Sequence, residues 1–371
     1  MLMKKMKVAL IGCGMISEVY LKNLKSFDAI ELVGCSDIIR ERAEKRAKEF
    51  GIKAMTNEEI FADKEIQFVV NTTYPLAHYE IIKSCLENGK HVYTEKMTTE
   101  TVEQATEVLK LAQSKGLFAG GAPDSFLGGG CQLARQIIDS GLIGTPVAVD
   151  AMLSRSYHHE RFYTGDYKRF AFCRNGGIIF DMGAYYLTHM IFLLGNIKQV
   201  SGFAQIIDPN RKYENPKCPL FGQDMTVESY NNITGSLLFE SGVLGHLTVT
   251  SEGGGTYNRF NIYGTNGRID LGDPNNFEGS IKLYNKNGAE SVIHTSHGFT
   301  GGNLRGIGAL DAVYAIKNGR APRCSVELNR HVLEAALGIC SGTTYNMTTY
   351  CDRPKPLKAG YTEYSELVFE K

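Results

Sequence analysis

Short apolar segments alternate with longer amphipathic ones along the first third of the chain. The apolar segments are rich in Val, Ile and Leu and too short for buried helices, so they predict strands, and the segments between them predict helices. The predicted strands cover residues 8–11, 32–36, 67–71, 91–94 and 117–120. Strands that alternate with helices pair in parallel, so this region predicts a doubly wound parallel sheet.

The pattern changes after Asp124. In several later segments apolar and polar positions alternate, which is typical of antiparallel strands, and two late helices are expected. The expected strands lie at residues 235–239, 243–250 and 260–263, and the expected helices at 303–317 and 327–340. This part therefore predicts a large, mostly antiparallel open sheet with helices on one face.

The chain length favours two domains, because 371 residues exceed one typical core. We place a Rossmann domain at residues 1–124 and an α/β domain with the large open sheet at 125–371, so the fold class is α/β. The 40 basic and 40 acidic residues balance, which argues against nucleic acid or an anionic membrane as partner. No segment reads as a membrane span or leaves room for a secretory signal, so a cytoplasmic location is expected.

Cysteine usage agrees with a reducing compartment. The nine cysteines include no Cys-x-x-Cys pair, and several of them lie in apolar surroundings. We expect small, reduced core residues rather than a disulfide scaffold.

The segment after the first predicted strand reads Gly12-Cys-Gly14-Met15-Ile16-Ser17 and leads into a predicted helix. Gly12 permits a tight turn, Gly14 lets the backbone approach a phosphate, and Ser17 is small enough for a helix to pack closely on a strand. The N–H groups at a helix N-terminus favour an anion. The segment therefore predicts a turn that binds the pyrophosphate of a dinucleotide.

Asp37 ends the second predicted strand, 20 residues after Ser17. A carboxylate at this separation accepts hydrogen bonds from the adenosine ribose and repels a 2'-phosphate. The expected cofactor is therefore NAD rather than NADP, although Arg40 nearby argues the other way. The alternative interpretation is that Asp37 is a solvated turn residue.

Further candidates for the cofactor site follow the other predicted strands, at the carboxyl edge where such sheets bind ligands. They are Thr72, Tyr74, His78, Glu95 and Lys96. Lys96 is expected at the nicotinamide end, where an ammonium can donate to a ribose hydroxyl and to a substrate oxygen. The alternative is an ordinary lysine at the end of a strand.

A second group of polar side chains lies on a predicted helix that begins near residue 178. Asp181, Tyr185, Thr188 and His189 share one face of this otherwise apolar helix. Polar groups are costly to bury without a purpose, which favours a functional role. The alternatives are that Asp181 caps the helix and that Tyr185 is a core or interface tyrosine.

Four motifs in this order resemble the family of glucose-fructose oxidoreductase, inositol dehydrogenase and MocA-type proteins. They are Gly12-Cys-Gly-Met-Ile-Ser17, Glu95-Lys96, Gly141-Leu-Ile-Gly-Thr-Pro146 and Gly176-Gly-x-x-x-Asp181-x-Gly183. The resemblance extends over nearly the whole chain. It implies a Rossmann domain and an α/β domain with the active site between them, and a homo-oligomer formed through the large sheet. It also implies redox chemistry on sugars, polyols and related hydroxy compounds with a nicotinamide cofactor.

Two positions depart from the family pattern. Met97 replaces the usual proline after Glu-Lys, and Tyr185 stands where histidine is frequent. Relatives with tyrosine at that position use the phenol as the acid–base group, so the resemblance implies catalytic roles for Lys96, Asp181 and Tyr185. Because a free phenol ionises only well above neutral pH, such a base needs a neighbouring positive charge. Residues 122–128 and 181–186 also resemble a branch that contains glycoside 3-oxidoreductases from gut bacteria.

Residues 156–163 combine aromatic, basic and histidine side chains. His158, His159 and Glu160 suggest a metal site, but adjacent residues rarely converge on one ion and no additional ligand lies at a matching spacing, so no metal is expected. We expect this segment to be a loop that offers stacking faces and donors to a sugar. The predicted substrate contacts are Asp124, Tyr157, His158, Arg169 and His189. For Arg169, plain surface charge is the open alternative.

The sequence thus predicts NAD-dependent hydride transfer between nicotinamide and a secondary hydroxyl of a sugar, glycoside or polyol. Tyr185 is expected to take the hydroxyl proton while Lys96 and Asp181 hold the oxygen. Two other functions stay open. One is a glycosidase that uses tightly held NAD for transient oxidation at C3 followed by elimination, and the other is a non-catalytic NAD-responsive binding protein.

Overall fold

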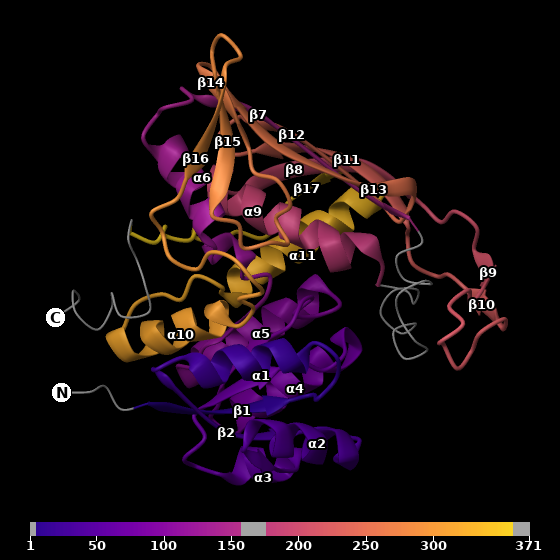
Figure 1. Ribbon diagram of the computed structural model, residues 1–371, viewed down its shortest axis with the longest axis vertical. Helices are drawn as coiled ribbons and strands as arrows, with labels where there is room; N and C mark the ends of the chain where they lie inside the picture. Colours follow the sequence, from indigo (N-terminus) through magenta and orange to yellow (C-terminus); the bar gives the residue numbers. More distant parts are fainter. Residues whose placement is uncertain (1–4, 157–175, 359–371) are drawn as a thin grey trace.

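The computed structural model describes residues 5–156 and 176–358. A six-stranded sheet with its helices forms one part of the molecule, and a nine-stranded sheet lies above it (Figure 1). This arrangement confirms the predicted α/β fold class.

The smaller sheet has the strand order β3-β2-β1-β4-β5-β6, and all of its pairs are parallel. Its strands are β1 (Met6–Ile11), β2 (Ile30–Ser36), β3 (Lys53–Ala54), β4 (Phe68–Asn71), β5 (His91–Thr94) and β6 (Ala119–Gly121). Val8, Leu10 and Val70 are fully buried, and each such side chain stabilises the fold by about 1.5–3 kcal/mol. The strand order reverses between β1 and β4, and such a reversal opens a ligand crevice at the carboxyl ends of the strands.

The connecting helices are α1 (Ser17–Ser26), α2 (Arg40–Phe50), α3 (Asn57–Ala62), α4 (Pro75–Glu87) and α5 (Val102–Lys115). Local sequence signals set several of their ends. Thr56 and Glu59 form a capping box at the start of α3, and Thr101 accepts from the backbone of Gln104 at the start of α5. Gly116 ends α5 in the left-handed conformation that glycine adopts without strain.

The large sheet has the order β16-β15-β14-β13-β7-β12-β11-β8-β17. Its central strands are β7 (Pro146–Ser156), β8 (Ile197–Gln205), β11 (Asn232–Phe239), β12 (Leu244–Thr250) and β13 (Glu252–Gly264). Its outer strands are β14 (Gly267–Asp270), β15 (Ser280–Asn285), β16 (Glu290–His294) and β17 (Thr344–Asn346). The β7–β12 pair is parallel and the other pairs are antiparallel, as expected for a mostly antiparallel sheet.

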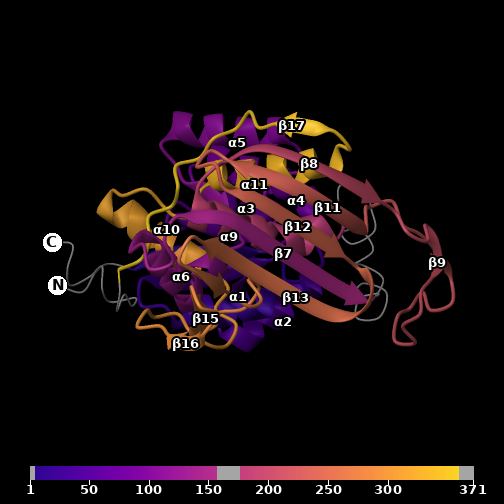
Figure 2. The same cartoon turned by 90° about the horizontal axis from the view of Figure 1, so that it is seen from above.

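Helices cover one face of the large sheet. They are α6 (Gly129–Asp139), α9 (Ala184–Leu194) and α11 (Val326–Cys340), and all three lie between the two sheets (Figure 1). Over β7, β11, β12 and β13 the described chain lays no helix on the opposite face, which Figure 2 views directly. A separate ribbon of β9 (Asn210–Lys212) and β10 (Asp224–Thr226) extends from one side.

Helix α11 also reaches the smaller sheet. The amide of Asn329 on α11 donates to the backbone carbonyls of Gly121 and Ala122, at 3.3 Å each. The helix expected from residue 303 instead begins at Ile307, as α10 (Ile307–Asn318). Gly306 has a φ of +103°, outside the helical range, so α10 starts after it, and residues 305–306 form a turn that leads into the helix.

No helix within residues 5–156 and 176–358 is long and apolar enough to cross a membrane.

Candidate active site

The glycine turn after β1 forms the floor of the crevice. Gly12 has a φ of +98°, and a Cβ there would lie 2.6 Å from the backbone nitrogen of Thr73. A Cβ on Gly14 would meet nothing within 4 Å, so the chain leaves open space where a ligand backbone can approach. Ser17 is fully buried at the start of α1, and its hydroxyl donates to the carbonyl of Gly14 at 2.6 Å. The turn has the shape that a dinucleotide phosphate requires.

Asp37 lies beside this turn at the end of β2. Its carboxylate accepts from the backbone N–H of Cys13 at 2.6 Å and from that of Ile39 at 2.8 Å. The half-buried side chain is therefore fixed at the rim of the crevice rather than loosely solvated. Arg40 is occupied elsewhere, since it pairs with Glu44 at 3.0 Å.

The other predicted cofactor residues fall into two groups. Met15, Tyr74 and neighbouring apolar residues are exposed at the carboxyl edge, where an adenine ring would cover them, while Ile16 is half-buried. Thr72 and His78 are buried, and their side chains bond to backbone carbonyls around the crevice. Thr72 donates to the carbonyl of Gly12 at 2.6 Å, and the His78 ring lies 2.7 Å from the carbonyl of Met97 and 2.9 Å from that of Thr73. Burial lowers the pKa of His78.

Lys96, just after β5, meets the second domain. Its Nζ lies 3.2 Å from Oδ1 of Asp181 and 3.5 Å from Oε2 of Glu95. Behind them, the Tyr20 hydroxyl on α1 donates to Glu95 at 2.6 Å. The predicted meeting of Lys96 and Asp181 is therefore present in the structure.

Lys96 and Glu95 keep each other charged. Burial alone would lower the pKa of Lys96, but Tyr185, Glu95 and Asp181 outweigh it and raise that pKa. Burial would likewise raise the pKa of Glu95, but the Lys96 ammonium and the Tyr20 hydrogen bond hold it below its usual range. The site thus presents a permanent ammonium beside a carboxylate.

Tyr185 completes the cluster from the first turn of α9. The Lys96 Nζ lies 5.6 Å from the centre of its ring. Asp181 lies in a π-helical turn, η3 (Ile179–Gly183), which precedes α9, so the regular helix expected from residue 178 is widened at this point. π-turns of this kind are frequent at functional sites.

Two residues near Tyr185, Arg305 and Asn275, were not predicted from the sequence. The guanidinium of Arg305 donates to the Tyr185 hydroxyl oxygen at 2.9 Å, and it also donates to the side-chain oxygen of Asn275. Neither residue belongs to a recognisable motif, and Arg305 lies where the apolar pattern predicts the first turn of a helix. The one sequence signal of an irregular segment is its position between the glycine pair at 301 and 302 and Gly306.

Asp124 and His189, two of the predicted substrate contacts, are buried and bond to the backbone. Asp124 Oδ2 accepts from the N–H groups of Gly306 at 2.8 Å and Gly308 at 3.0 Å, and burial raises the pKa of its carboxyl. The His189 Nδ1 lies 2.7 Å from the carbonyl of Tyr185, and burial lowers the pKa of His189 to about 4. A neutral His189 that donates through Nδ1 carries an acceptor at Nε2.

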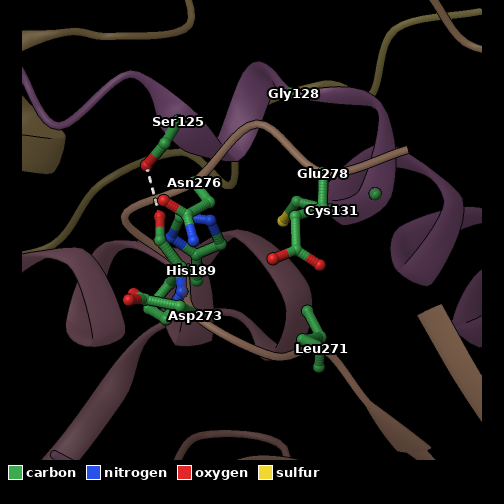
Figure 3. Close-up of a pocket in the computed structure, with 10 residues that line it drawn as sticks. Ser125, Gly128, Cys131, His189, Leu271, Asp273, Asn276 and Glu278 are labelled. Atoms are coloured by element: carbon green, nitrogen blue, oxygen red, sulfur yellow. Dashed lines mark hydrogen bonds between the residues drawn. The ribbon is translucent and has the colours of Figure 1, made fainter. Parts of the chain in front are cut away.

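A small pocket lies next to His189 (Figure 3). Asp273, Asn276 and His189 lie on one side of it, with Cys131 and Glu278 on the other, and Ser125 donates to the carbonyl of Pro274 at 2.7 Å. Asn275, which bonds Arg305, belongs to the same loop. The loop at 273–276 therefore contributes Asp273, Pro274 and Asn276 to the pocket and Asn275 to the contacts of Arg305.

The remaining predicted substrate residues, Tyr157, His158 and Arg169, lie outside the described residues. The suggested metal ligands His159 and Glu160 lie there too. In the described part of the chain, no three His, Cys, Asp or Glu side chains are grouped to hold a metal ion.

Two family models match this chain. Residues 6–120 match an oxidoreductase family with an NAD-binding Rossmann fold, and residues 131–270 match the GFO/IDH/MocA C-terminal domain. The fold and the glycine crevice thus define the class as oxidoreductases with an NAD-binding Rossmann domain. The chain belongs to the Gfo/Idh/MocA family, as the sequence motifs predicted.

Individual relatives agree with this assignment. The scyllo-inositol 2-dehydrogenase (NAD(+)) of Bacillus subtilis is 26% identical over 289 residues, which cover 72% of this chain and 74% of that one. An uncharacterized oxidoreductase of Schizosaccharomyces pombe is 28% identical over 204 residues, 54% of each chain, so this chain spans about half the length of that relative. Levoglucosan dehydrogenase in complex with NADH and L-sorbose has a TM-score of 0.80 at 18% identity, covering 94% of this chain and 100% of that one. Identity this low shows a shared fold.

Proposed function

We propose that this protein is an NAD-dependent dehydrogenase that transfers hydride between nicotinamide and a secondary hydroxyl of a sugar, glycoside or polyol. The observation that carries the proposal is the 3.2 Å contact between Lys96 and Asp181, which joins the two domains beside the glycine crevice and next to Tyr185. The relatives named as inositol dehydrogenases support a polyol or sugar as the substrate.

The crevice fits a dinucleotide. Gly12 and Gly14 would face the pyrophosphate, Asp37 the adenosine ribose, and the exposed Met15 and Tyr74 the adenine. The carboxylate of Asp37 would repel a 2'-phosphate, so we propose NAD rather than NADP. Bound NAD would supply the acceptor for the hydride that leaves the substrate carbon.

The chain's own groups handle the proton and the oxygen. Tyr185 takes the hydroxyl proton when an alcohol is oxidised and returns it when a ketone is reduced. Lys96 stays charged and donates to the substrate oxygen, which stabilises the negative charge that develops there. Asp181 orients the Lys96 ammonium. Within the described residues, Lys96 and Arg305 are balanced by Glu95 and Asp181, which suits an uncharged substrate.

The test combines binding and turnover. Wild-type protein with NAD is expected to form reduced nicotinamide with at least one member of a panel of inositols, aldoses and glycosides. Lys96→Met and Tyr185→Phe should bind NAD and lose turnover by about 100-fold or more. Lys83→Met and Tyr79→Phe on α4, outside the site, are the matched controls. Parent-like turnover in both site variants would refute the assignment.

We further propose oxidation at C3 of a glycoside, because residues 122–128 and 181–186 resemble the glycoside 3-oxidoreductase branch. Product analysis distinguishes this from the glycosidase alternative. A dehydrogenase accumulates reduced nicotinamide and a 3-keto glycoside, whereas a glycosidase releases the aglycone without net cofactor reduction. Tight NAD binding without either product would favour a non-catalytic binding protein.

We also propose a homo-oligomer that forms through the open face of the large sheet. Phe203, Leu244 and Tyr257 are exposed there on β8, β12 and β13. Exposed apolar side chains on a sheet face are typical of an interface. The mass in solution should exceed that of one chain and should fall on Phe203→Arg or Leu244→Arg. The cytoplasmic location stays a prediction.

A further inference from the structure

The backbone before α10 is anchored from two directions. The Asn23 amide on α1 donates to the carbonyl of Asn303 at 2.9 Å and to that of Arg305 at 2.8 Å. The buried Asp124 carboxylate accepts from the N–H groups of Gly306 and Gly308. Residue 305 is thus fixed by the Rossmann helix on one side and by the start of α10 on the other.

The guanidinium of Arg305, in this anchored segment, contacts Tyr185, the candidate base. It donates to the Tyr185 oxygen at 2.9 Å and to Asn275, and a second nitrogen donates to Asn303 at 2.8 Å. Its carbon lies 5.7 Å from the centre of the Tyr185 ring. These contacts hold the planar fork in one orientation.

The chemistry of these contacts restricts the phenol. A guanidinium has N–H donors and no acceptor, so the Tyr185 oxygen must accept from it. The phenol proton therefore points away from Arg305 and can be exchanged with another partner. When that proton leaves, the guanidinium at hydrogen-bonding distance stabilises the negative oxygen.

We propose that Arg305 is a positioning residue of this site, which holds the Tyr185 oxygen in place and balances its charge when the phenol is ionised. The inference rests on the proposed dehydrogenase function and extends it. In oxidation, the O–H bond of the alcohol breaks and its proton bonds to the ionised Tyr185 oxygen, while Arg305 keeps its own protons. In ketone reduction, the proton follows the reverse path.

Other titratable groups also surround Tyr185. Lys96 after β5 and Asp181 in η3 lie on one side, with Glu95 and Tyr20 behind Lys96. The ring of His189 contacts the Tyr185 backbone carbonyl. Lys96 is held by two carboxylates, whereas Arg305 donates a hydrogen bond to the phenol oxygen itself. The two cations are therefore expected to have separable effects.

The kinetic test uses Arg305→Ala and Arg305→Lys. Loss of the guanidinium should lower kcat by about 10- to 100-fold with little change in KM or NAD affinity. The pH at which the oxidation rate rises should move upward, because the ionised phenol loses its counterion. Added guanidinium ion should restore part of the activity of Arg305→Ala. Arg305→Lys should keep part of the wild-type activity. Arg268→Ala, which removes a guanidinium stacked on Tyr284 in the large sheet, is the matched control.

An unchanged kcat and pH profile in Arg305→Ala would overturn the proposal, as would a raised KM at constant kcat, which would make Arg305 a substrate-binding group. Should Arg305→Ala fail to fold, the kcat, KM and pH profile of Arg305→Lys are compared with those of wild type instead. Tyrosinate absorbance separates this test from the proposed function, since it needs no substrate and the chain has no Trp. The difference between wild type and Tyr185→Phe reports one phenol, whose ionisation should move to higher pH without Arg305. No movement would overturn the proposal even if the dehydrogenase activity is found.

Discussion

The Lys96 ammonium lies 3.2 Å from the Asp181 carboxylate, across the junction between the parallel sheet and the helices of the large sheet. Both side chains are largely buried, as is that of Glu95, the second carboxylate beside Lys96. Removing one member of a buried ion pair leaves an uncompensated charge. The pair is therefore a link between the domains as well as part of the site.

The first prediction concerns this link. Lys96→Met should lower the free energy of unfolding by about 3 kcal/mol, because Asp181 and Glu95 lose their counterion. In a double-mutant cycle, Lys96→Met and Asp181→Asn should couple by about 1–3 kcal/mol. Denaturant titrations measure both quantities. Additive effects would show that the contact does not stabilise the protein.

The second prediction contrasts two glycines of the same turn. Gly12→Ala should destabilise the protein by about 1–3 kcal/mol, because its Cβ would collide with the backbone of Thr73 at a positive φ. Gly14→Ala should leave unfolding unchanged within about 0.5 kcal/mol, since open space surrounds its Cβ. Its NAD affinity should nevertheless fall by about 10-fold or more, which calorimetric titration measures. If Gly14→Ala binds NAD like the parent, the pyrophosphate lies elsewhere.

The third prediction concerns cofactor choice. Asp37→Ser removes the carboxylate that accepts from Cys13 at the rim of the crevice. The ratio of NAD to NADP affinity should fall by about 10- to 100-fold, because a ribose acceptor and a repulsive charge are lost together. Arg40→Ala, next to the site, is the control. It should leave NAD affinity unchanged and could lower only the affinity for NADP. An unchanged ratio in Asp37→Ser would exclude the carboxylate as the selector.

The sequence was most informative where chemistry is local. The spacing of Gly12, Ser17 and Asp37 predicts a crevice because one strand–helix–strand unit brings these residues together. Lys96 and Asp181 meet only through the packing of two domains, so their proximity followed from the family resemblance and not from any pattern along the chain.

Other features could not be read from the sequence. The π-turn at Asp181 and the turn at residues 305–306 interrupt segments whose apolar pattern predicts regular helix, because tertiary packing fixes their backbone. The hydrogen bonds of Asp124 to Gly306 and Gly308 depend on the return of the chain to the Rossmann domain. No spacing rule connects such distant residues.

The fourth prediction concerns acid stability, away from the site. Glu334 on α11 accepts from the backbone of Thr348 at 2.9 Å and Thr349 at 2.8 Å, and from both hydroxyls and that of Tyr345. Burial would raise its pKa, but these hydrogen bonds hold it below its ordinary value of 4.5. The stabilisation is therefore present above that value and is lost as the pH falls through the lowered pKa.

At neutral pH, Glu334→Gln should be less stable than wild type by about 2–3 kcal/mol. The difference should shrink as wild-type Glu334 becomes protonated in acid. Unfolding titrations between neutral and acid pH measure it, with Glu240→Gln at an exposed position as the control. A pH-independent difference would mean that the hydrogen-bond geometry, and not the charge, stabilises this contact.

The most direct test of the account is a crystal structure of the protein with NAD bound. We expect the pyrophosphate on the turn at Gly12 and Gly14 and the nicotinamide ring beside Lys96 and Tyr185, with both polar groups within reach of one substrate oxygen. A nicotinamide bound away from these two side chains would contradict the account.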